Sequence, residues 1–180
     1  MNKVIAIVGM CGSGKSIASD ILENKGYAKI YFGGVTLEKL KEKNLEVTPE
    51  NEKMMREKLR EDLGMGAFAT ILLPRIKEFA LQKNVVLDGL YSWDEYQILS
   101  EELGNQLIVI AVVADKKLRY SRLEKREVRP LTRKEARNRD LAEIENIRKA
   151  PPIAFADYYI INNGTIEEYK DRLEEIIKQI

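Results

Sequence analysis

The chain has 180 residues, of which 44% are hydrophobic and 33% charged, and its net charge of +1 argues against a general nucleic-acid-binding protein. A single cysteine excludes an internal disulfide, and the lack of histidine excludes histidine-based acid–base chemistry and metal sites. No apolar run approaches the about 20 residues that a membrane span needs. We expect one domain spanning 1–180, cytoplasmic, a monomer or small homo-oligomer, without nucleic-acid or membrane partners.

Apolar runs alternate with helical patterns along the chain. The runs are continuous, which is typical of parallel strands covered on both faces. The predicted strands are 3–8, 28–32, 85–88, 106–114 and 157–162. The predicted helices are 15–25, 35–43, 49–82, 93–103, 116–127, 132–149 and 165–179. This alternation predicts a doubly wound α/β fold that binds its ligands at the carboxyl ends of the strands.

Residues 9–16 read GMCGSGKS and fit the pattern G-x-x-x-x-G-K-[ST], between a predicted strand and a predicted helix. Glycines let backbone N–H groups turn inward around phosphate oxygens. The Lys15 ammonium reaches the β- and γ-phosphates, and the Ser16 hydroxyl ligates Mg²⁺. We interpret Cys11 as a small filler rather than a reactive thiol. The pattern predicts ATP and Mg²⁺ as cofactors, with the nucleotide bound by Gly9, Gly12, Ser13, Gly14, Lys15 and Ser16.

Asp88 ends the strand VVLD and is followed by Gly89. By itself, this acid either caps the following turn or binds a metal ion. In a protein with a phosphate loop, an acid at this place holds Mg²⁺ or its water. We therefore expect Ser16 and Asp88 to be the metal ligands.

Arginine is concentrated in one segment. Residues 116–149 carry 13 Lys and Arg against 6 Asp and Glu, and seven of the twelve arginines lie within 119–139. In a helix, Arg119, Arg122, Arg126 and Arg129 share one face, and Pro130 then interrupts. Two solvated helices would give a similar pattern. Because arginine suits bidentate phosphate recognition, we favour a flap that closes over transferring phosphates.

Four features together resemble the nucleoside-monophosphate-kinase group of P-loop proteins: residues 9–16, the VVLDG run at 85–89, the arginine segment, and the ending ADYYIINNGT at 156–165. Within this group the likeness is greatest to archaeal adenylate kinase-related and dephospho-CoA kinase-like proteins. The resemblance implies a P-loop NTPase fold with a five-stranded parallel sheet and helices on both faces. It also implies an acceptor-binding helical insertion at about 33–82 and a small helical LID at about 122–140.

The resemblance also implies roles for single residues. The first arm of the LID would carry Arg122 and Arg126, and the second Arg137 and Arg139, with Asp140 orienting one of these arginines. The ATP adenine would lie near Asn162 and Gly164. The implied catalytic residues are Lys15, Asp88, Arg122, Arg126 and Arg137.

The acceptor region departs from the family pattern. Relatives often read G-D-V-x-R where this chain has GGVTL at 33–37, and DGLYS at 88–92 lacks the arginine of the adenylate kinase motif D-G-F-P-R. The remaining arginines for an acceptor are Arg56, Arg60 and Arg75. The sequence predicts an ATP-dependent kinase with a small nucleotide or nucleotide-like acceptor. It leaves open a dephospho-CoA kinase, and a nucleotide-dependent switch or binding protein with slow ATP hydrolysis.

Overall fold

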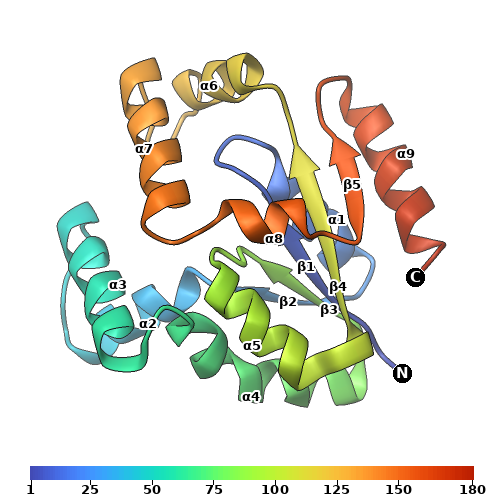
Figure 1. Cartoon of the computed structure of the whole chain (residues 1–180), viewed down its shortest axis with the longest axis horizontal. Coiled ribbons are helices and arrows are strands. Elements are labelled where there is room, and N and C mark those ends of the chain that lie inside the picture. Colours follow the sequence, from blue (N-terminus) through green and yellow to red (C-terminus); the bar gives the residue numbers. More distant parts are fainter.

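The computed structural model describes residues 1–180 and contains one sheet of five parallel strands (Figure 1). The strand order is β2-β3-β1-β4-β5. The strands are β1 (Val4–Val8), β2 (Ala28–Tyr31), β3 (Val85–Asp88), β4 (Leu107–Val113) and β5 (Tyr158–Ile161). All five lie within the predicted runs, and the α/β fold class is confirmed.

Helices cover both faces of the sheet, because successive residues of the buried strands point to opposite sides. Val4, Ala6 and Val8 pack in a core with α2 to α5, whereas Ile5 and Ile7 pack against α1 and α9. No helix combines the length and apolar character required to cross a membrane. The helices are α1 (Lys15–Asn24), α2 (Gly34–Glu42), α3 (Pro49–Leu63), α4 (Ala67–Gln82), α5 (Trp93–Leu103), α6 (Lys116–Glu124), α7 (Arg133–Glu145), α8 (Ala150–Ala154) and α9 (Ile166–Ile177), with a short 3-10 turn at Gly104–Gln106.

The helix predicted over 49–82 is wrong as a single element, because it is divided at residues 64–66. Gly64 adopts a φ of 80°, which L-residues rarely reach, and ends α3 there. At Gly66 a side chain would collide with Ile98 of α5. This break lets α3 turn away from α4, so that one side of α3 remains free to border a cleft.

The helix predicted over 132–149 also ends early. Helix α7 stops at Glu145, Arg148 adopts a positive φ of 51°, and the unpredicted α8 follows. Two prolines at the start of α8 fit the first helical turn, where a missing N–H costs nothing. The turn between α7 and α8 places Lys149 inside the protein.

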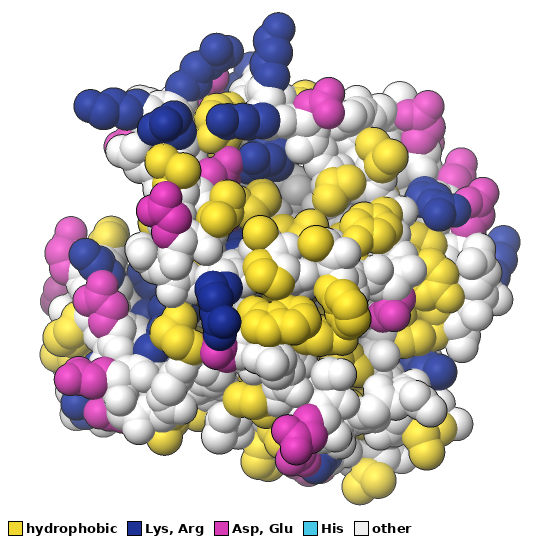
Figure 2. Space-filling model, viewed as in Figure 1, with side chains coloured by type: hydrophobic (Ala, Val, Ile, Leu, Met, Phe, Trp, Pro, Cys, Tyr) yellow, Lys and Arg dark blue, Asp and Glu magenta, His cyan; other side chains and the backbone are white.

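Helices α6 and α7 form a hairpin, residues 116–145, above the carboxyl ends of β1 and β4, and α3 lies opposite α7 (Figure 1). A small core of its own holds the hairpin together, in which Tyr120 and Leu123 of α6 meet Ala136 of α7. Cys11 of the phosphate loop is buried in the same core, as its interpretation as a filler requires. Figure 2 shows Lys and Arg side chains gathered over α6 and α7.

Candidate functional site

The phosphate loop connects β1 to α1 and depends on glycine for its shape. Gly9, Gly12 and Gly14 have φ values of 148°, 79° and 102°. A Cβ at Gly9 would collide with the Val112 carbonyl, and one at Gly14 with the Asn162 side chain. The loop is therefore both left-handed and tightly enclosed, which only glycine permits at these positions.

Three side chains from distant elements fix the outer carbonyls of this loop. Asn162 donates from Nδ2 to the Ser13 carbonyl at 2.7 Å, the Tyr169 hydroxyl donates to the Gly14 carbonyl at 3.1 Å, and Arg119 donates to the Cys11 carbonyl at 2.9 Å. The N–H groups of Lys15 and Ser16, the first two of α1, have no partner within the helix, as is usual at a helix start. The loop thus presents donors to an anion.

Lys15 lies at the start of α1, and its Nζ donates to the Met10 carbonyl at 3.1 Å. Burial, together with the nearby charge of Lys149, lowers the pKa of the Lys15 ammonium to about 7. Phosphate oxygens would supply further negative charge beside this half-buried cation.

Asp88 lies at the carboxyl end of β3, directly beside Ile7 of β1, and is buried. Its Oδ2 accepts a hydrogen bond of 3.0 Å from the Ser19 hydroxyl of α1, one turn beyond Ser16. The donor set here is one carboxylate with nearby hydroxyls, and no cluster of three acidic residues is present. These residues fit Mg²⁺ bound jointly with phosphates, because Mg²⁺ retains several waters and needs no all-protein cage.

A small pocket of about 180 Å³ adjoins the phosphate loop. Asn162 and Gly164 line it, as does Arg122, whose Nη2 donates to the Asn162 carbonyl at 3.0 Å. The other terminal nitrogen of Arg122, Nη1, is buried without a partner. The remaining lining residues are Gly14, Ile17 and Ile166. The structure thus brings together the residues expected at the adenine, with a planar guanidinium and apolar side chains as walls.

In the α6–α7 hairpin, Asp140 does not bind the arginines that the sequence led us to expect. Both Asp140 oxygens bind Arg119, at 3.0 and 2.7 Å, and Tyr120 donates to Asp140 at 3.1 Å. The expectation that Asp140 orients one of the four LID arginines is therefore wrong, because α7 turns this carboxylate toward Arg119 and Tyr120 of α6. Arg126 and Arg137 are exposed. They line neither the small pocket beside the phosphate loop nor the larger cleft between α3 and α7.

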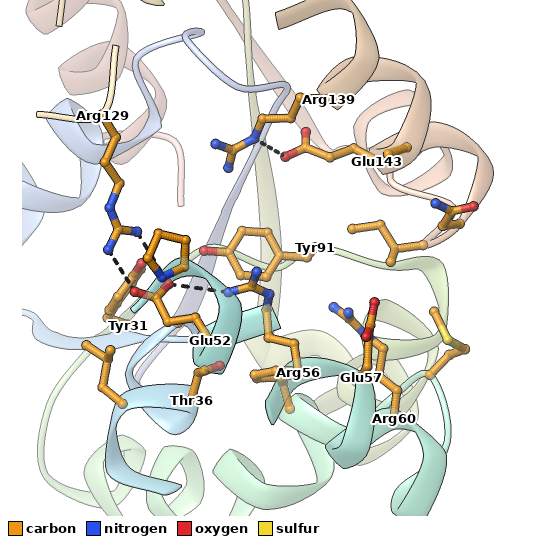
Figure 3. A pocket seen from close by; sticks show the side chains of 18 of the residues that line it. Tyr31, Thr36, Glu52, Arg56, Glu57, Arg60, Tyr91, Arg129, Arg139 and Glu143 are labelled. Atoms are coloured by element: carbon orange, nitrogen blue, oxygen red, sulfur yellow. Dashed lines mark hydrogen bonds and ion pairs between the residues drawn. The ribbon is translucent and has the colours of Figure 1, made fainter. Parts of the chain in front are cut away.

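A larger cleft of about 910 Å³ lies between the α3 side of the molecule and α7. Figure 3 shows Arg56 and Arg60 entering it from α3, and Arg129 and Arg139 entering from the hairpin side. Arg75, the third arginine considered for an acceptor, lies elsewhere and binds Glu38 at 3.1 Å. Four of the chain's arginines thus converge on one cleft.

Acidic side chains inside the cleft bind three of these arginines: Arg56, Arg129 and Arg139. Glu52 of α3 accepts two bonds from Arg129, at 2.7 and 3.3 Å, and one from Arg56 at 3.4 Å (Figure 3). These arginines lower the pKa of Glu52. On the opposite wall, Glu143 of α7 accepts from Arg139 at 3.1 Å. The cleft therefore contains alternating charges that a polar ligand can engage.

Two tyrosines line the cleft near the strand ends. The Tyr31 side chain lies over Gly33, and the Tyr91 hydroxyl lies over Gly89, where any larger residue would collide with it. Glu52, Tyr91, Glu143 and Lys149 were not among the expected site residues. They come from three separate places in the sequence, 52, 91 and 143–149, and none belongs to a contiguous motif.

The sheet order and the phosphate loop define the class: a P-loop protein with a kinase-like fold. The sequence model of the AAA domain family matches residues 5–146. The chain is 37% identical to a UPF0200 protein of Sulfurisphaera tokodaii, covering 99% of this chain and 97% of the relative. It is 32% identical to the UPF0200 protein PH1008 of Pyrococcus horikoshii, covering 98% and 97%. The chain belongs to the UPF0200 family.

Two solved structures share the fold across nearly the whole chain. One is TT1252 from Thermus thermophilus, with a TM-score of 0.65 at 18% identity, covering 99% of this chain and 98% of that one. The other is shikimate kinase from Bacteroides thetaiotaomicron, with a TM-score of 0.59 at 14% identity, covering 98% and 97%. The P-loop kinase group is thus supported, and the finer likeness to adenylate kinase-related and dephospho-CoA kinase-like proteins remains a prediction.

Proposed function

We propose that the protein is an ATP-dependent kinase that transfers the γ-phosphoryl group to a nucleotide or nucleotide-like acceptor. The observation that carries this proposal is the arginine-lined cleft between α3 and α7, next to the phosphate-loop site. Its volume of about 910 Å³ is in the range of small-molecule sites. A protein that only bound or hydrolysed ATP would not need a second cleft of this composition.

On the donor side, the phosphate loop would bind the triphosphate, and the pocket beside Arg122 and Asn162 would take the adenine. Ser16 and Asp88 would hold Mg²⁺, which neutralises charge on the β- and γ-phosphates. The Lys15 ammonium would reach the same oxygens. The places of these side chains around the loop support these roles.

On the acceptor side, Arg56 and Arg60 supply the phosphate-binding groups that the altered GGVTL segment lacks. Arg60 is suited to this role because its Nε is buried without a partner. Accessible apolar side chains of the same cleft, Leu37, Val47 and Met65, provide a surface for a base or another flat group. This combination of anion-binding and apolar groups supports a nucleotide-like acceptor.

Positioning and charge neutralisation carry phosphoryl transfer, with little covalent chemistry by the protein. Closure of the α6–α7 hairpin would exclude water and thereby suppress ATP hydrolysis. A phosphate acceptor is already ionised and needs no base. For a hydroxyl acceptor, as in dephospho-CoA, Asp88 would be the general base.

An acceptor screen tests the proposal directly. Purified protein is incubated with Mg-ATP labelled at the γ-phosphate and a panel of nucleoside monophosphates and dephospho-CoA. We expect label on a nucleotide with wild type and none with Lys15→Ala, whose fold is checked by circular dichroism. Label on dephospho-CoA would instead assign the hydroxyl acceptor. Slow hydrolysis without labelling of any acceptor would contradict the kinase proposal and favour the switch.

A further inference from the structure

We infer that Lys149 is a second phosphate-binding lysine, which contacts the γ-phosphoryl group of the bound nucleotide opposite Lys15. The inference rests on the proposed function, because it assumes a nucleoside triphosphate at the phosphate loop. It adds a residue that lies outside the expected LID and outside the phosphate-loop motif.

Lys149 immediately precedes α8, and its side chain is buried, with 3% of its surface exposed. Its Nζ donates to Oε2 of Glu143 at 2.8 Å and lies 5.2 Å from the centre of the Tyr91 ring. A lysine on a protein surface retains its water shell, whereas this ammonium has exchanged water for one carboxylate and an aromatic face. Burying a charge in this way costs free energy unless opposite charges or hydrogen-bond acceptors compensate it.

The charge balance around this lysine is incomplete. Glu143 is shared, because its other oxygen accepts from Arg139 at 3.1 Å, so one carboxylate serves two cations. Lys15 adds a third cation, close enough to Lys149 for their charges to repel. Of these three cations only Lys149 is buried, and the carboxylates of Glu143 and Asp88 lie nearby, which leaves one more cation than anions. An ion pair kept only for stability would not need this surplus cation beside a buried ammonium. A phosphoryl group would supply the missing negative charge.

The contacts of Lys149 place it where the two halves of the site meet. Its ammonium lies over Tyr91, the hydroxyl of Tyr91 reaches Gly89, and Gly89 follows Asp88. Its partner Glu143 borders the acceptor cleft. Through Tyr91 and Glu143, Lys149 therefore contacts the acceptor side of the site, and it is not among the residues that line the pocket that we assign to adenine.

Binding alone tests this role, without any acceptor. Affinities of ADP and of the non-hydrolysable triphosphate AMP-PNP are measured with Mg²⁺ by calorimetry. In Lys149→Met we expect AMP-PNP to bind about tenfold or more weakly, as for loss of a charged hydrogen bond, while ADP affinity stays within about twofold. The control is Lys117→Met, an exposed lysine of α6 outside the site, which should change neither affinity.

If Lys149→Met weakens the affinities for ADP and AMP-PNP equally, or changes neither, the inference is overturned. Glu143→Gln provides an independent arm should Lys149→Met fold poorly. It removes the carboxylate that competes for Lys149, so the preference for AMP-PNP over ADP should increase, and an unchanged or reduced preference contradicts the role. Failure of the kinase proposal is distinguishable, because it would leave acceptors unlabelled while this preference remained.

Discussion

Arg119 and Asp140 form a forked ion pair, with nitrogen–oxygen distances of 3.0 and 2.7 Å, and both side chains are buried. The same guanidinium donates to the Cys11 carbonyl. One pair of residues therefore ties α6 to α7 and both to the phosphate loop.

Asp140→Ala should destabilise the protein strongly, because it leaves the Arg119 charge buried without a counter-ion. The expected loss is about 3–5 kcal/mol in the free energy of unfolding, measured by urea denaturation. The control is Glu175→Ala, which breaks the exposed pair with Arg172 and should cost less than about 1 kcal/mol. Similar costs for the two variants would show that the buried pair has no special role.

Asp88→Asn should reduce Mg²⁺-dependent activity more than it reduces nucleotide binding measured without metal. The volume is nearly unchanged, and the amide oxygen can still accept from the Ser19 hydroxyl, so the loss is chiefly that of a charge. Activity is titrated with Mg²⁺ for both proteins. Superimposable curves would mean that Asp88 serves only the turn that follows it.

Arg126→Ala and Arg137→Ala test whether the hairpin closes. Both side chains are exposed, so they can reach a phosphate only after movement of the hairpin. If they act there, kcat and kcat/KM fall together while ATP affinity changes little, and the loss can reach about 10³-fold. Arg→Lys should not restore the rate fully, because a point charge does not replace the guanidinium fork.

Arg172→Ala on α9 is the control for these variants, because Arg172 is exposed and its ion pair lies within its own helix. Rates must be measured with the true acceptor, because transfer to water, which is ATP hydrolysis, does not require closure of the hairpin. Unchanged turnover in both the Arg126 and the Arg137 variant would remove the LID assignment.

Glu95 should make stability depend on pH. Its Oε2 caps α5 by accepting from the N–H groups of Tyr91 and Ser92, while Oε1 is buried without a partner. Burial raises the pKa of Glu95 from 4.5 to about 7. Between these values only the folded state holds the proton, so stability falls as pH rises through this window and is constant above it. The fall is at most about 3 kcal/mol, at about 1.4 kcal/mol per pH unit.

Glu95→Gln keeps a capping oxygen but removes the ionisable group. The stability of the variant relative to wild type should therefore increase between pH 5 and pH 8, measured by urea denaturation. Glu168→Gln is a matched control, because Glu168 occupies the same capping position at α9 but is exposed. A relative stability of the Glu95 variant that does not change with pH would contradict this account.

The sheet could be read from the sequence because each buried strand is a continuous apolar run, which is a local signal. The division at residues 64–66 was missed because the helical pattern continues on both sides and two glycines alone do not fix a turn. The phosphate loop was predictable because the residues that would surround a phosphate are consecutive in the chain, at 9–16, and therefore form a recognisable motif. The cleft was not, because tertiary packing brings Glu52 of α3 and Glu143 of α7 to the same cleft, and both resemble solvated charges in the sequence.

The carboxylate of Glu52 binds an arginine of the acceptor-side helix and an arginine of the hairpin loop at once. An acceptor anion that draws Arg56 away therefore alters how firmly Arg129 is held. Reciprocally, a movement of the hairpin caused by ATP would alter the arginine that the acceptor meets. If the protein binds both ligands as proposed, such sharing would give them a coupling free energy, and thermodynamic linkage would require each to change the affinity of the other by the same factor. The order in which the two ligands bind then changes the pathway but not that factor.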